Sequence, residues 1–193
     1  GHGHACVDVI EISGKYKIAG LVEKNEQGLK SILGYPILGA NDDLENLRQQ
    51  YSYALITVGQ IKSPNIRIKL YNLLKELDFT LPVIISPKAY VSKHAQIGEG
   101  SIIMHGSIVN ANAKIGKNCI INNQSLIEHD ATIGDHCHIS TNAIVNGGVD
   151  VGNNSFIGSG SVLIQSISIG AECVIGAGLV IKNDIEPSQL VRN

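Results

Sequence analysis

Residues 91–121 read VSKHAQ IGEGSI IMHGSI VNANAK IGKNCI I, and an aliphatic residue opens each group of six. The register continues, so that every sixth residue from Val91 to Ile181 is valine, isoleucine or leucine. The residue two positions before each of these is mostly alanine, serine or cysteine. Side chains two residues apart in an extended segment point to the same side, so both sets are expected to face an interior. The repeat therefore predicts a parallel β-helix.

A glycine follows the aliphatic residue at every third repeat. These glycines are Gly98, Gly116, Gly134, Gly152 and Gly170, which are spaced 18 residues apart. The spacing predicts three short strands per coil. We expect the glycines to mark one corner of each coil, where the chain needs a positive φ.

The residues just before the aliphatic ladder should point outward and form three columns, of which one is polar. A second column is apolar: Tyr90, Ile108, Leu126, Ile144, Val162 and Val180. The third is apolar except for one histidine: Ile102, Ile120, His138, Phe156 and Val174. Apolar stripes on an outer surface indicate an interface, and two different stripes favour a head-to-tail contact that closes into a ring. With three faces per coil, a homotrimer is predicted.

The first 85 residues have no such repeat and alternate predicted strands with predicted helices. Helices are expected at 5–12, from Asp42 or Asp43 to 50, and at 66–77, with strands at 16–23, 54–58 and 83–85 and turns at 34–39. This order is typical of an α/β, Rossmann-like domain with a small parallel sheet. We therefore predict an N-terminal domain at 1–85, a β-helix domain at 86–182 and a C-terminal tail at 183–193.

Ligands bind small parallel sheets beyond the C-terminal ends of the strands. The residues at those ends are Gly1, His2, Gly3, Glu23, Lys24, Gly59 and Gln60. They are the candidate substrate-binding residues of the N-terminal domain.

Composition excludes several classes of function. The chain has 15 lysines and arginines against 17 aspartates and glutamates, a net charge of −2, which argues against nucleic-acid binding. It has no apolar stretch long enough to span a membrane and no signal-peptide pattern, so we expect a cytoplasmic protein without membrane attachment. The four cysteines form no CxxC pair and are expected to be free thiols.

The tripeptide Glu128-His129-Asp130 carries the candidate chemistry. Its neighbours one coil before and after His129 are Ala111 and Gly147, and these small residues leave room for a ligand against the imidazole. An adjacent carboxylate can select the tautomer of a histidine and raise its basicity, as a general base requires. His138, which interrupts an apolar column, is either a ligand contact between subunits or a packed interfacial histidine.

The histidines also permit a metal hypothesis. Three imidazoles drawn from His105, His129, His136 and His138 would suit a zinc site with an open position. His105 and His129 fall in different columns of the coil, however, and no carboxylate or thiolate set completes the site. We predict no metal.

Several motifs in this order resemble a known family over nearly the whole chain. They are an initial Gly-His-Gly, Gly34-Tyr-Pro-Ile-Leu-Gly39, a segment ending in Gly59, Ser86-Pro87-Lys-Ala89, and Ile127-Glu-His-Asp-Ala-Thr-Ile-Gly-Asp-His-Cys-His-Ile139. The chain resembles the left-handed β-helix sugar acetyltransferases, which include sialic acid O-acetyltransferases and the bacillosamine- and perosamine-type N-acetyltransferases. The resemblance implies a left-handed coil and a homotrimer with acetyl-CoA bound between neighbouring β-helices.

The resemblance also implies roles for individual residues. His129 matches the catalytic base and Asp130 the acidic residue that polarises it. The cofactor-binding positions are matched by His138, Gly147, Ser159 and Ala177, with the Gly147 amide facing the thioester oxygen. Asn122 and Glu128 match sugar-side positions, and Glu23, Lys24 and Gln60 fall where the family contacts the nucleotide.

The implied function is acetyl-CoA-dependent N-acetylation of a nucleotide-linked 4-amino-deoxy hexose in bacterial surface-glycan biosynthesis, by direct transfer with a histidine base. O-acetylation of sialic acid or another sugar is an alternative, because the same base serves a hydroxyl. A γ-type zinc carbonic anhydrase and a non-catalytic β-helix scaffold are alternatives from other classes.

Overall fold

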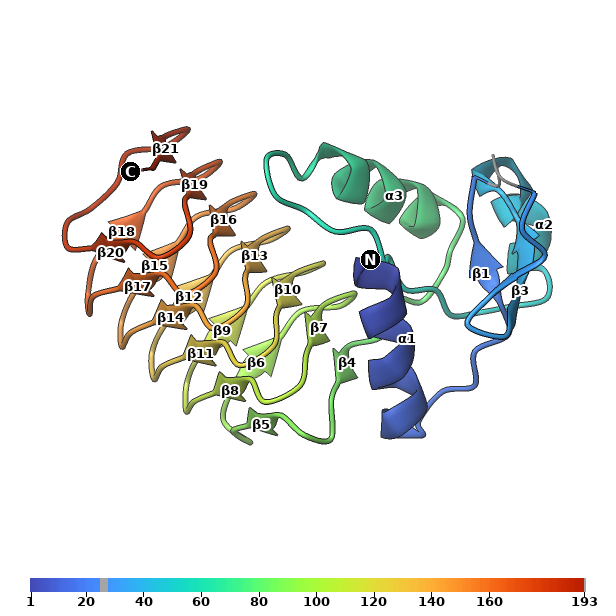
Figure 1. Ribbon diagram of the computed structural model, residues 1–193, viewed down its shortest axis with the longest axis horizontal. Coiled ribbons are helices and arrows are strands. Elements are labelled where there is room, and N and C mark those ends of the chain that lie inside the picture. The colour runs from blue at the N-terminus through green and yellow to red at the C-terminus, as the bar shows by residue number, and fades with distance from the viewer. Residues whose placement is uncertain (25–27, 193) are drawn as a thin grey trace.

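The computed structural model describes residues 1–24 and 28–192, which form an N-terminal domain and a long coil (Figure 1). The coil lies on the left of Figure 1 and rises from β5 at its lower end to β21 near the C-terminus. Its strands are two residues long, pair in parallel and form three sheets. This arrangement is a parallel β-helix, as the six-residue repeat predicts.

The β-helix has three faces, each of which is one parallel sheet. Face 1 consists of β4 (Ile84–Ile85), β7 (Ile102–Ile103), β10 (Ile120–Ile121), β13 (His138–Ile139), β16 (Phe156–Ile157), β19 (Val174–Ile175) and β21 (Leu190–Val191). Face 2 consists of β5 (Tyr90–Val91), β8 (Ile108–Val109), β11 (Leu126–Ile127), β14 (Ile144–Val145), β17 (Val162–Leu163) and β20 (Val180–Ile181). Face 3 consists of β6 (Gln96–Ile97), β9 (Lys114–Ile115), β12 (Thr132–Ile133), β15 (Asp150–Val151) and β18 (Ser168–Ile169).

The interior of the β-helix is formed by the aliphatic ladder, which is buried from Ile103 to Ile175. The small inward residues do more than fill space. The Ser101 hydroxyl donates to the Gly116 carbonyl and accepts from the Cys119 amide, both at 2.8 Å. These bonds satisfy backbone groups at the corners, which would otherwise be buried without a partner.

The glycines spaced 18 residues apart serve a different purpose from the one we expected. From Ile97 to Ile175, the positive φ angles of the coil fall three positions after each ladder residue, for example at Asn112 and Asp130, and Gly98 and Gly134 are not among them. A Cβ on Gly98 would instead stand 2.6 Å from the carbonyl carbon of Gly116 in the next coil. The predicted role in positive φ is therefore wrong, and close stacking of the coils explains these glycines.

The N-terminal domain is an α/β unit on the right of Figure 1. Its elements are α1 (His2–Ser13), β1 (Leu21–Val22), β2 (Ser31–Ile32), β3 (Tyr35–Gly39), the 3-10 helix η1 (Asn41–Asp43), α2 (Leu44–Arg48) and α3 (Asn65–Glu76). The sheet has the order β1-β3-β2, with β1 and β3 parallel and β2 antiparallel to β3. The predicted helix at 66–77 is confirmed within one residue, but the sheet is mixed rather than parallel.

Two local predictions in this domain are wrong. The initial Gly-His-Gly-His is the first turn of α1 rather than a turn before it. The segment 34–39, expected as turns, forms β3, the central strand of the sheet.

The segment 54–58 also differs from the predicted strand: the structure has an isolated bridge between Tyr53 and Thr80 just before it, and no strand within it. The buried side chain of Arg67 explains the difference, because it donates to the carbonyls of Ile56 at 3.1 Å and Val58 at 2.7 Å. These carbonyls bond to a guanidinium instead of a neighbouring strand.

Face 1 is covered by the chain's own N-terminal domain. Cys6 and Val9 on α1 pack against Ile102, Met104 and Ile120, and all five side chains have an exposed fraction of 0%. We expected both apolar columns at contacts between copies. On face 1, Ile102 and Ile120 of this column are instead buried within one chain, because α1 packs against them, whereas Val174 at the upper end is only partly buried (Figure 1).

The β-helix extends at both ends beyond the predicted range of 86–182. β4 pairs with β7 and so belongs to the coil. At the other end, Ile185 bridges Ile169, and β21 pairs with β19. Among the described residues, no helix is long and apolar enough to cross a membrane.

Candidate active site

His129 stands at the corner between face 2 and face 3, in the loop from β11 to β12. Asp130 has a φ of 62°, and this left-handed turn brings its carboxylate back beside the preceding imidazole. Nδ1 of His129 donates to Oδ2 of Asp130 at 2.8 Å. Because a carboxylate only accepts, the neutral ring carries its proton on Nδ1 and leaves Nε2 as the basic nitrogen. The His129 side chain is 66% exposed.

The residues one coil before this corner hold its two carboxylates. The Asn112 amide donates to Oδ1 of Asp130 at 2.7 Å, and the Asn110 amide donates to Oε2 of Glu128 at 2.8 Å. These two asparagines were not among the predicted site residues. The 18-residue period contains the signal that would have found them, since it places them directly beside Asp130 and Glu128.

Gly147, one coil after His129, lies against the imidazole. A Cβ at Gly147 would stand 2.8 Å from Cε1 of His129 and 2.9 Å from Nε2. The glycine therefore makes room for the imidazole itself, whereas we expected room for a ligand on that side.

The carboxylates at this corner favour the charged imidazole. The hydrogen bond from Nδ1 to Asp130 raises the pKa of His129 above its ordinary value, and the charges of Asp130 and Glu128 add to this. The hydrogen bond from Asn112 lowers the pKa of Asp130, followed by the bond from His129. His129 thus pairs with an ionised carboxylate and has raised basicity, as a general base requires.

His138 lies on face 1 in a different environment, and its side chain is buried. Its Nδ1 donates to the Gln60 carbonyl at 2.6 Å, and its Nε2 accepts from the Asn122 amide at 3.1 Å. The edge of its ring meets Phe156, with 5.2 Å between the ring centroids. Burial lowers the pKa of His138 to about 4, so the ring is neutral near pH 7.

The structure brings several predicted substrate-binding residues to His138. Gln60, which is 3% exposed, bonds His138 through its carbonyl and the His136 carbonyl through its side-chain amide at 3.0 Å. The Cα of Gly59 faces His2, where an added Cβ would stand 3.5 Å from the Cβ of His2. The His2 ring lies 6.5 Å from the ring of His138.

The other predicted substrate-binding residues of the N-terminal domain lie on α1 and after β1. Gly1 is the N-cap of α1, and Gly3 faces Thr57, with an added Cβ 3.4 Å from its hydroxyl. Glu23 follows β1, where its amide donates to the Gly39 carbonyl at 3.0 Å, and Lys24 comes next in the chain.

Glu23 lines a shallow pocket of about 470 Å³ in the mixed sheet of the N-terminal domain. The other lining residues are Gly28, Leu29, Lys30, Ile37, Leu38, Gly39 and Ala40. In Figure 1 this sheet lies at the side of the domain away from the β-helix. Glu23 therefore belongs to a different surface from Gly59 and Gln60.

The predicted cofactor-binding residues occupy different edges of the β-helix. Ser159 and Ala177 lie one coil apart at the corner between face 1 and face 2, where the Ser159 hydroxyl bonds that of Ser140 at 2.9 Å. Gly147 lies with His129 at the corner between face 2 and face 3. Within one chain, the proposed base and the proposed cofactor contacts are thus not all brought together.

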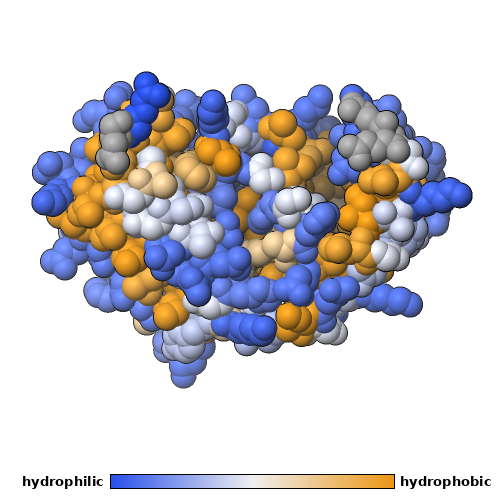
Figure 2. Space-filling view, in the orientation of Figure 1, coloured by the Kyte–Doolittle hydropathy of each residue, from blue (hydrophilic) through white to orange (hydrophobic). Residues whose placement is uncertain are grey.

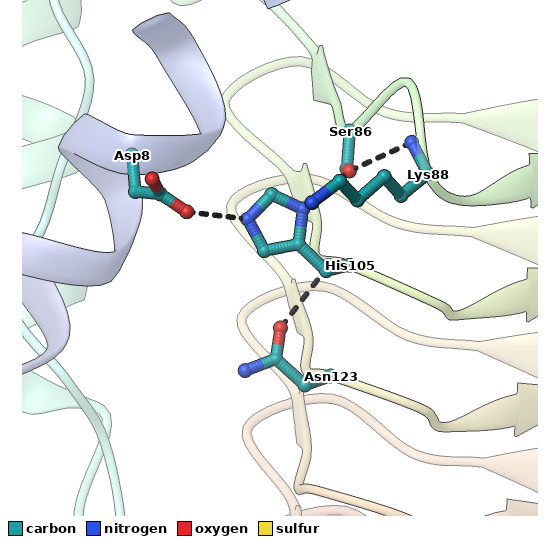
Figure 3. Close-up of polar contacts among 5 residues, drawn as sticks. All are labelled: Asp8, Ser86, Lys88, His105 and Asn123. Atoms are coloured by element: carbon teal, nitrogen blue, oxygen red, sulfur yellow. Dashed lines mark hydrogen bonds and ion pairs between the residues drawn. The ribbon is translucent and has the colours of Figure 1, made fainter. Parts of the chain in front are cut away.

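Another histidine with a carboxylate partner shows why His129 differs. His105 Nε2 donates to Asp8 of α1 at 2.8 Å, but its Nδ1 bonds the buried hydroxyl of Ser86 at 2.6 Å (Figure 3). With both nitrogens occupied, this ring fastens α1 to the β-helix and has no nitrogen left for a substrate. Nε2 of His129 has no hydrogen-bond partner within residues 1–24 and 28–192, and the ring stands at an exposed corner.

The histidines considered for a zinc site do not converge. His105 contacts Asp8, His136 contacts the Asn118 amide at 3.0 Å, and His138 contacts Gln60. In residues 1–24 and 28–192, no group of three or more histidine, cysteine, aspartate or glutamate side chains is arranged to hold a metal ion.

The molecular surface is indented between the β-helix on the left and the N-terminal domain on the right (Figure 2). Hydrophobic residues gather on both sides of this indentation in the view shown.

The apolar column of face 2 remains partly uncovered, with exposed fractions of 60% at Tyr90, 40% at Ile108 and 56% at Val180. This column is an exposed apolar surface of the kind that marks an interface.

Comparisons with protein families cover both parts of the chain. Residues 1–74 match the PglD N-terminal domain. Residues 94–129, 112–147 and 130–165 match the bacterial transferase hexapeptide, and 148–183 match the hexapeptide repeat of succinyl-transferase. No curated protein matches the chain.

Solved structures match over the whole chain. A variant of perosamine N-acetyltransferase from Caulobacter crescentus, in complex with CoA and GDP-perosamine, is 31% identical with a TM-score of 0.92, and the match covers 98% of this chain and 88% of that one. The acetyltransferase domain of PglB from Neisseria gonorrhoeae, in complex with acetyl coenzyme A, is 30% identical with a TM-score of 0.92, covering 100% and 92%. WeeI from Acinetobacter baumannii, at 23% identity and a TM-score of 0.90 over 100% and 92%, shares the fold. The predicted architecture, an α/β domain followed by a left-handed β-helix, is confirmed.

Proposed function

Because the chain belongs to the family of hexapeptide-repeat sugar N-acetyltransferases with a PglD-type N-terminal domain, we propose that it acetylates the amino group of a nucleotide-linked amino sugar, with acetyl-CoA as donor. A relative of 31% identity was solved with CoA and a GDP-linked amino sugar, and another of 30% identity with acetyl-CoA. Both matches extend across the β-helix and the N-terminal domain. These ligands favour an amine over a hydroxyl as acceptor.

The arrangement of His129 is the observation that carries the proposed chemistry. Nδ1 is held by Asp130 at 2.8 Å, and Nε2 has no hydrogen-bond partner in the part of the chain that the structure describes. As the sugar amine attacks the acetyl carbonyl, Nε2 takes a proton from the nitrogen, and the C–N bond forms. The C–S bond then breaks, and the CoA sulfur takes that proton from the imidazolium. General-base assistance of this kind contributes roughly 10²–10⁴-fold.

Gly147 supplies a second group at the same corner. Its amide N–H donates to no acceptor among residues 1–24 and 28–192, so it is available to a ligand. A backbone donor directed at a developing oxyanion contributes roughly 10²–10³-fold. We propose this role for the Gly147 amide, and the rest of the acceleration comes from holding the two substrates together.

His138 acts in this scheme as a hydrogen-bond acceptor toward the cosubstrate. Its Nδ1 proton is committed to the Gln60 carbonyl, and the one lone pair of Nε2 accepts from the Asn122 side-chain amide at 3.1 Å. In this proposal a donor of the cosubstrate takes the place of that amide. Burial keeps the ring neutral, with a pKa of about 4. A neutral Nε2 suits an N–H or S–H donor, such as the pantetheine amide or the thiol of released CoA.

The site is completed, in this proposal, by a second copy of the chain. His129 lies at the corner between face 2 and face 3, whereas His138 lies on face 1 and Ser159 at the corner between face 1 and face 2. The exposed apolar column of face 2 offers the packing surface. A head-to-tail contact repeated three times places the corner of one copy beside face 1 of the next, which gives three equivalent sites.

The experiment is a thiol-release assay with acetyl-CoA and a panel of UDP-, GDP- and dTDP-linked amino sugars, with sialic acid as a hydroxyl acceptor. We expect thiol release with at least one amino sugar and N-acetylated product by mass spectrometry. His129→Ala should lower kcat by roughly 10²–10⁴-fold, because the base is lost.

The control for His129→Ala is acetyl-CoA binding measured by calorimetry, which should be retained because His129 is exposed and makes no core contact. Wild-type turnover in His129→Ala would contradict the general-base assignment. Acetylation of sialic acid alone would contradict the amine acceptor.

A further inference from the structure

Glu128-His129-Asp130 lies on a matching tripeptide, Asn110-Ala111-Asn112, one coil earlier. Backbone hydrogen bonds hold the two tripeptides in register. The backbone N–H of Asn110 donates to the Ile127 carbonyl at 2.9 Å, and the backbone N–H of Asp130 donates to the Ala111 carbonyl at 3.2 Å. Each carboxylate of the upper tripeptide then faces an asparagine side chain of the lower one. This alignment follows from the parallel pairing of β8 and β11.

We propose that Asn112 is a positioning residue for acetyl transfer, acting through Asp130 on His129, and that Asn110 holds Glu128 toward the sugar in the same way. The proposal rests on the function proposed above. Neither asparagine touches the reacting atoms in this account. They form a platform that sets the orientation of the residues that do.

Asn112 and His129 each bond one oxygen of the Asp130 carboxylate, so the two contacts together fix its orientation. The Asn112 amide donates to Oδ1 at 2.7 Å, and the His129 Nδ1 donates to Oδ2 at 2.8 Å. The Asp130 side chain is 56% exposed, so without a second anchor its carboxylate would be free to rotate into water. The bond from Asn112 also lowers the pKa of Asp130, which keeps it ionised.

Backbone geometry alone does not explain these asparagines. Asn112 has a φ of 61°, a conformation that asparagine tolerates, and asparagines occupy other corners of the coil for the same reason. Asn110, however, is not among the residues with positive φ. Its side chain nevertheless bonds Glu128 at 2.8 Å, so the pair of asparagines matches the pair of carboxylates rather than the turn.

The test compares Asn112→Gly and Asn110→Ala in the full-length enzyme, with rates measured against pH on the preferred amino sugar. Glycine suits the positive φ at residue 112, so the variant removes the amide without straining the corner. Losing a hydrogen bond to a charged group should lower kcat about tenfold in Asn112→Gly. The acidic limb of its rate profile should move to lower pH, because His129 loses its fixed carboxylate.

Asn110→Ala should instead raise the KM for the sugar and leave the acidic limb in place, because Glu128 is predicted on the sugar side. The matched control is Asn154→Gly, which replaces an asparagine of φ 66° at a corner between face 3 and face 1. Asn154→Gly should leave both the KM for the sugar and the position of the acidic limb unchanged. Thermal melts of all three variants check that the fold is retained.

Two results would contradict the positioning role of the two asparagines. One is Asn112→Gly with wild-type kcat and an unmoved acidic limb, and the other is an identical effect of both variants, which would indicate general distortion. The function itself is tested separately by His129→Ala. If that variant is inactive while Asn112→Gly is normal, the positioning role fails and the general base stands.

Discussion

Histidines of this chain differ in what their two ring nitrogens touch. Nδ1 of His129 bonds Asp130, and its Nε2 has no partner among the described residues. His105 has both nitrogens occupied, by Asp8 and Ser86. His138 is held by the Gln60 carbonyl and a side-chain amide in a buried position. The partners of each ring therefore separate the proposed base, His129, from a histidine that fastens α1 to the β-helix, His105, and a buried neutral histidine, His138.

The pH dependence of the reaction follows from the raised pKa of His129. A base acts only when unprotonated, so kcat/KM should rise as pH increases through that raised value. Asp130→Asn removes the charge that raises the pKa, so the acidic limb should move to lower pH. The value of kcat/KM on the high-pH plateau should fall about tenfold, because a weaker base takes the proton less readily.

Steady-state rates against pH with one amino sugar measure this effect. The amine of the substrate titrates identically with both enzymes, so the difference between their profiles isolates His129. An unchanged acidic limb in Asp130→Asn would contradict the claim that Asp130 raises the pKa of His129.

At the scale of elements, the repeat carried most of what the sequence could predict. The ladder from Val91 fixed both the strand positions and the inward residues, because a hexapeptide coil has little freedom once its core is filled. Gly98 and Gly134 were assigned to corners for the wrong reason, since stacking against the next coil leaves no mark in one-dimensional periodicity. His129 and Asp130 were adjacent in sequence and so were predictable.

The secondary structure of the N-terminal domain was harder to predict, because its short elements depend on contacts between residues distant in sequence. The segment 54–58 reads as a strand, yet its carbonyls bond Arg67. The covering of face 1 by α1 was likewise invisible, since an apolar column looks the same whether its partner is in the same chain or in another copy. Asn112 is distant from Asp130 in sequence and was missed.

Arg67 connects these elements and allows a prediction about stability. Its guanidinium is 1% exposed and donates to Ile56, Val58 and Asn118, including the Asn118 side-chain oxygen at 2.6 Å. Burial lowers its pKa to about 10. Arg67→Met should lower the free energy of unfolding by about 3 kcal/mol, because several buried carbonyls lose their donors.

Urea denaturation measures the effect of Arg67→Met. Arg48→Met is the matched control, because the Arg48 guanidinium makes one exposed bond to the Asp78 carbonyl and lies 5.9 Å from the centroid of the Phe79 ring. Its loss should change stability by about 1 kcal/mol or less. Equal stability of Arg67→Met and the wild type would show that the buried guanidinium does not fasten the loop to the β-helix.

At the scale of the whole molecule, the chain covers one apolar face by itself and leaves another exposed. α1 buries Ile102 and Ile120 on face 1, whereas Tyr90 and Val180 on face 2 remain 60% and 56% exposed. His129 and His138 lie on different sides of the coil. Both facts support an assembly in which face 2 meets a second copy and each site draws residues from two chains.

The central claim, a site shared between two copies, is tested most directly by combining two inactive variants. His129→Ala removes the base, and His138→Asn removes the Nε2 lone pair while keeping an amide that can donate to the Gln60 carbonyl. Co-expression with different tags, followed by purification on both, isolates mixed oligomers. Each separate variant should be inactive, whereas a mixed head-to-tail trimer has one intact site and should recover about a third of wild-type turnover. Mixed oligomers as inactive as the separate variants would contradict the shared site.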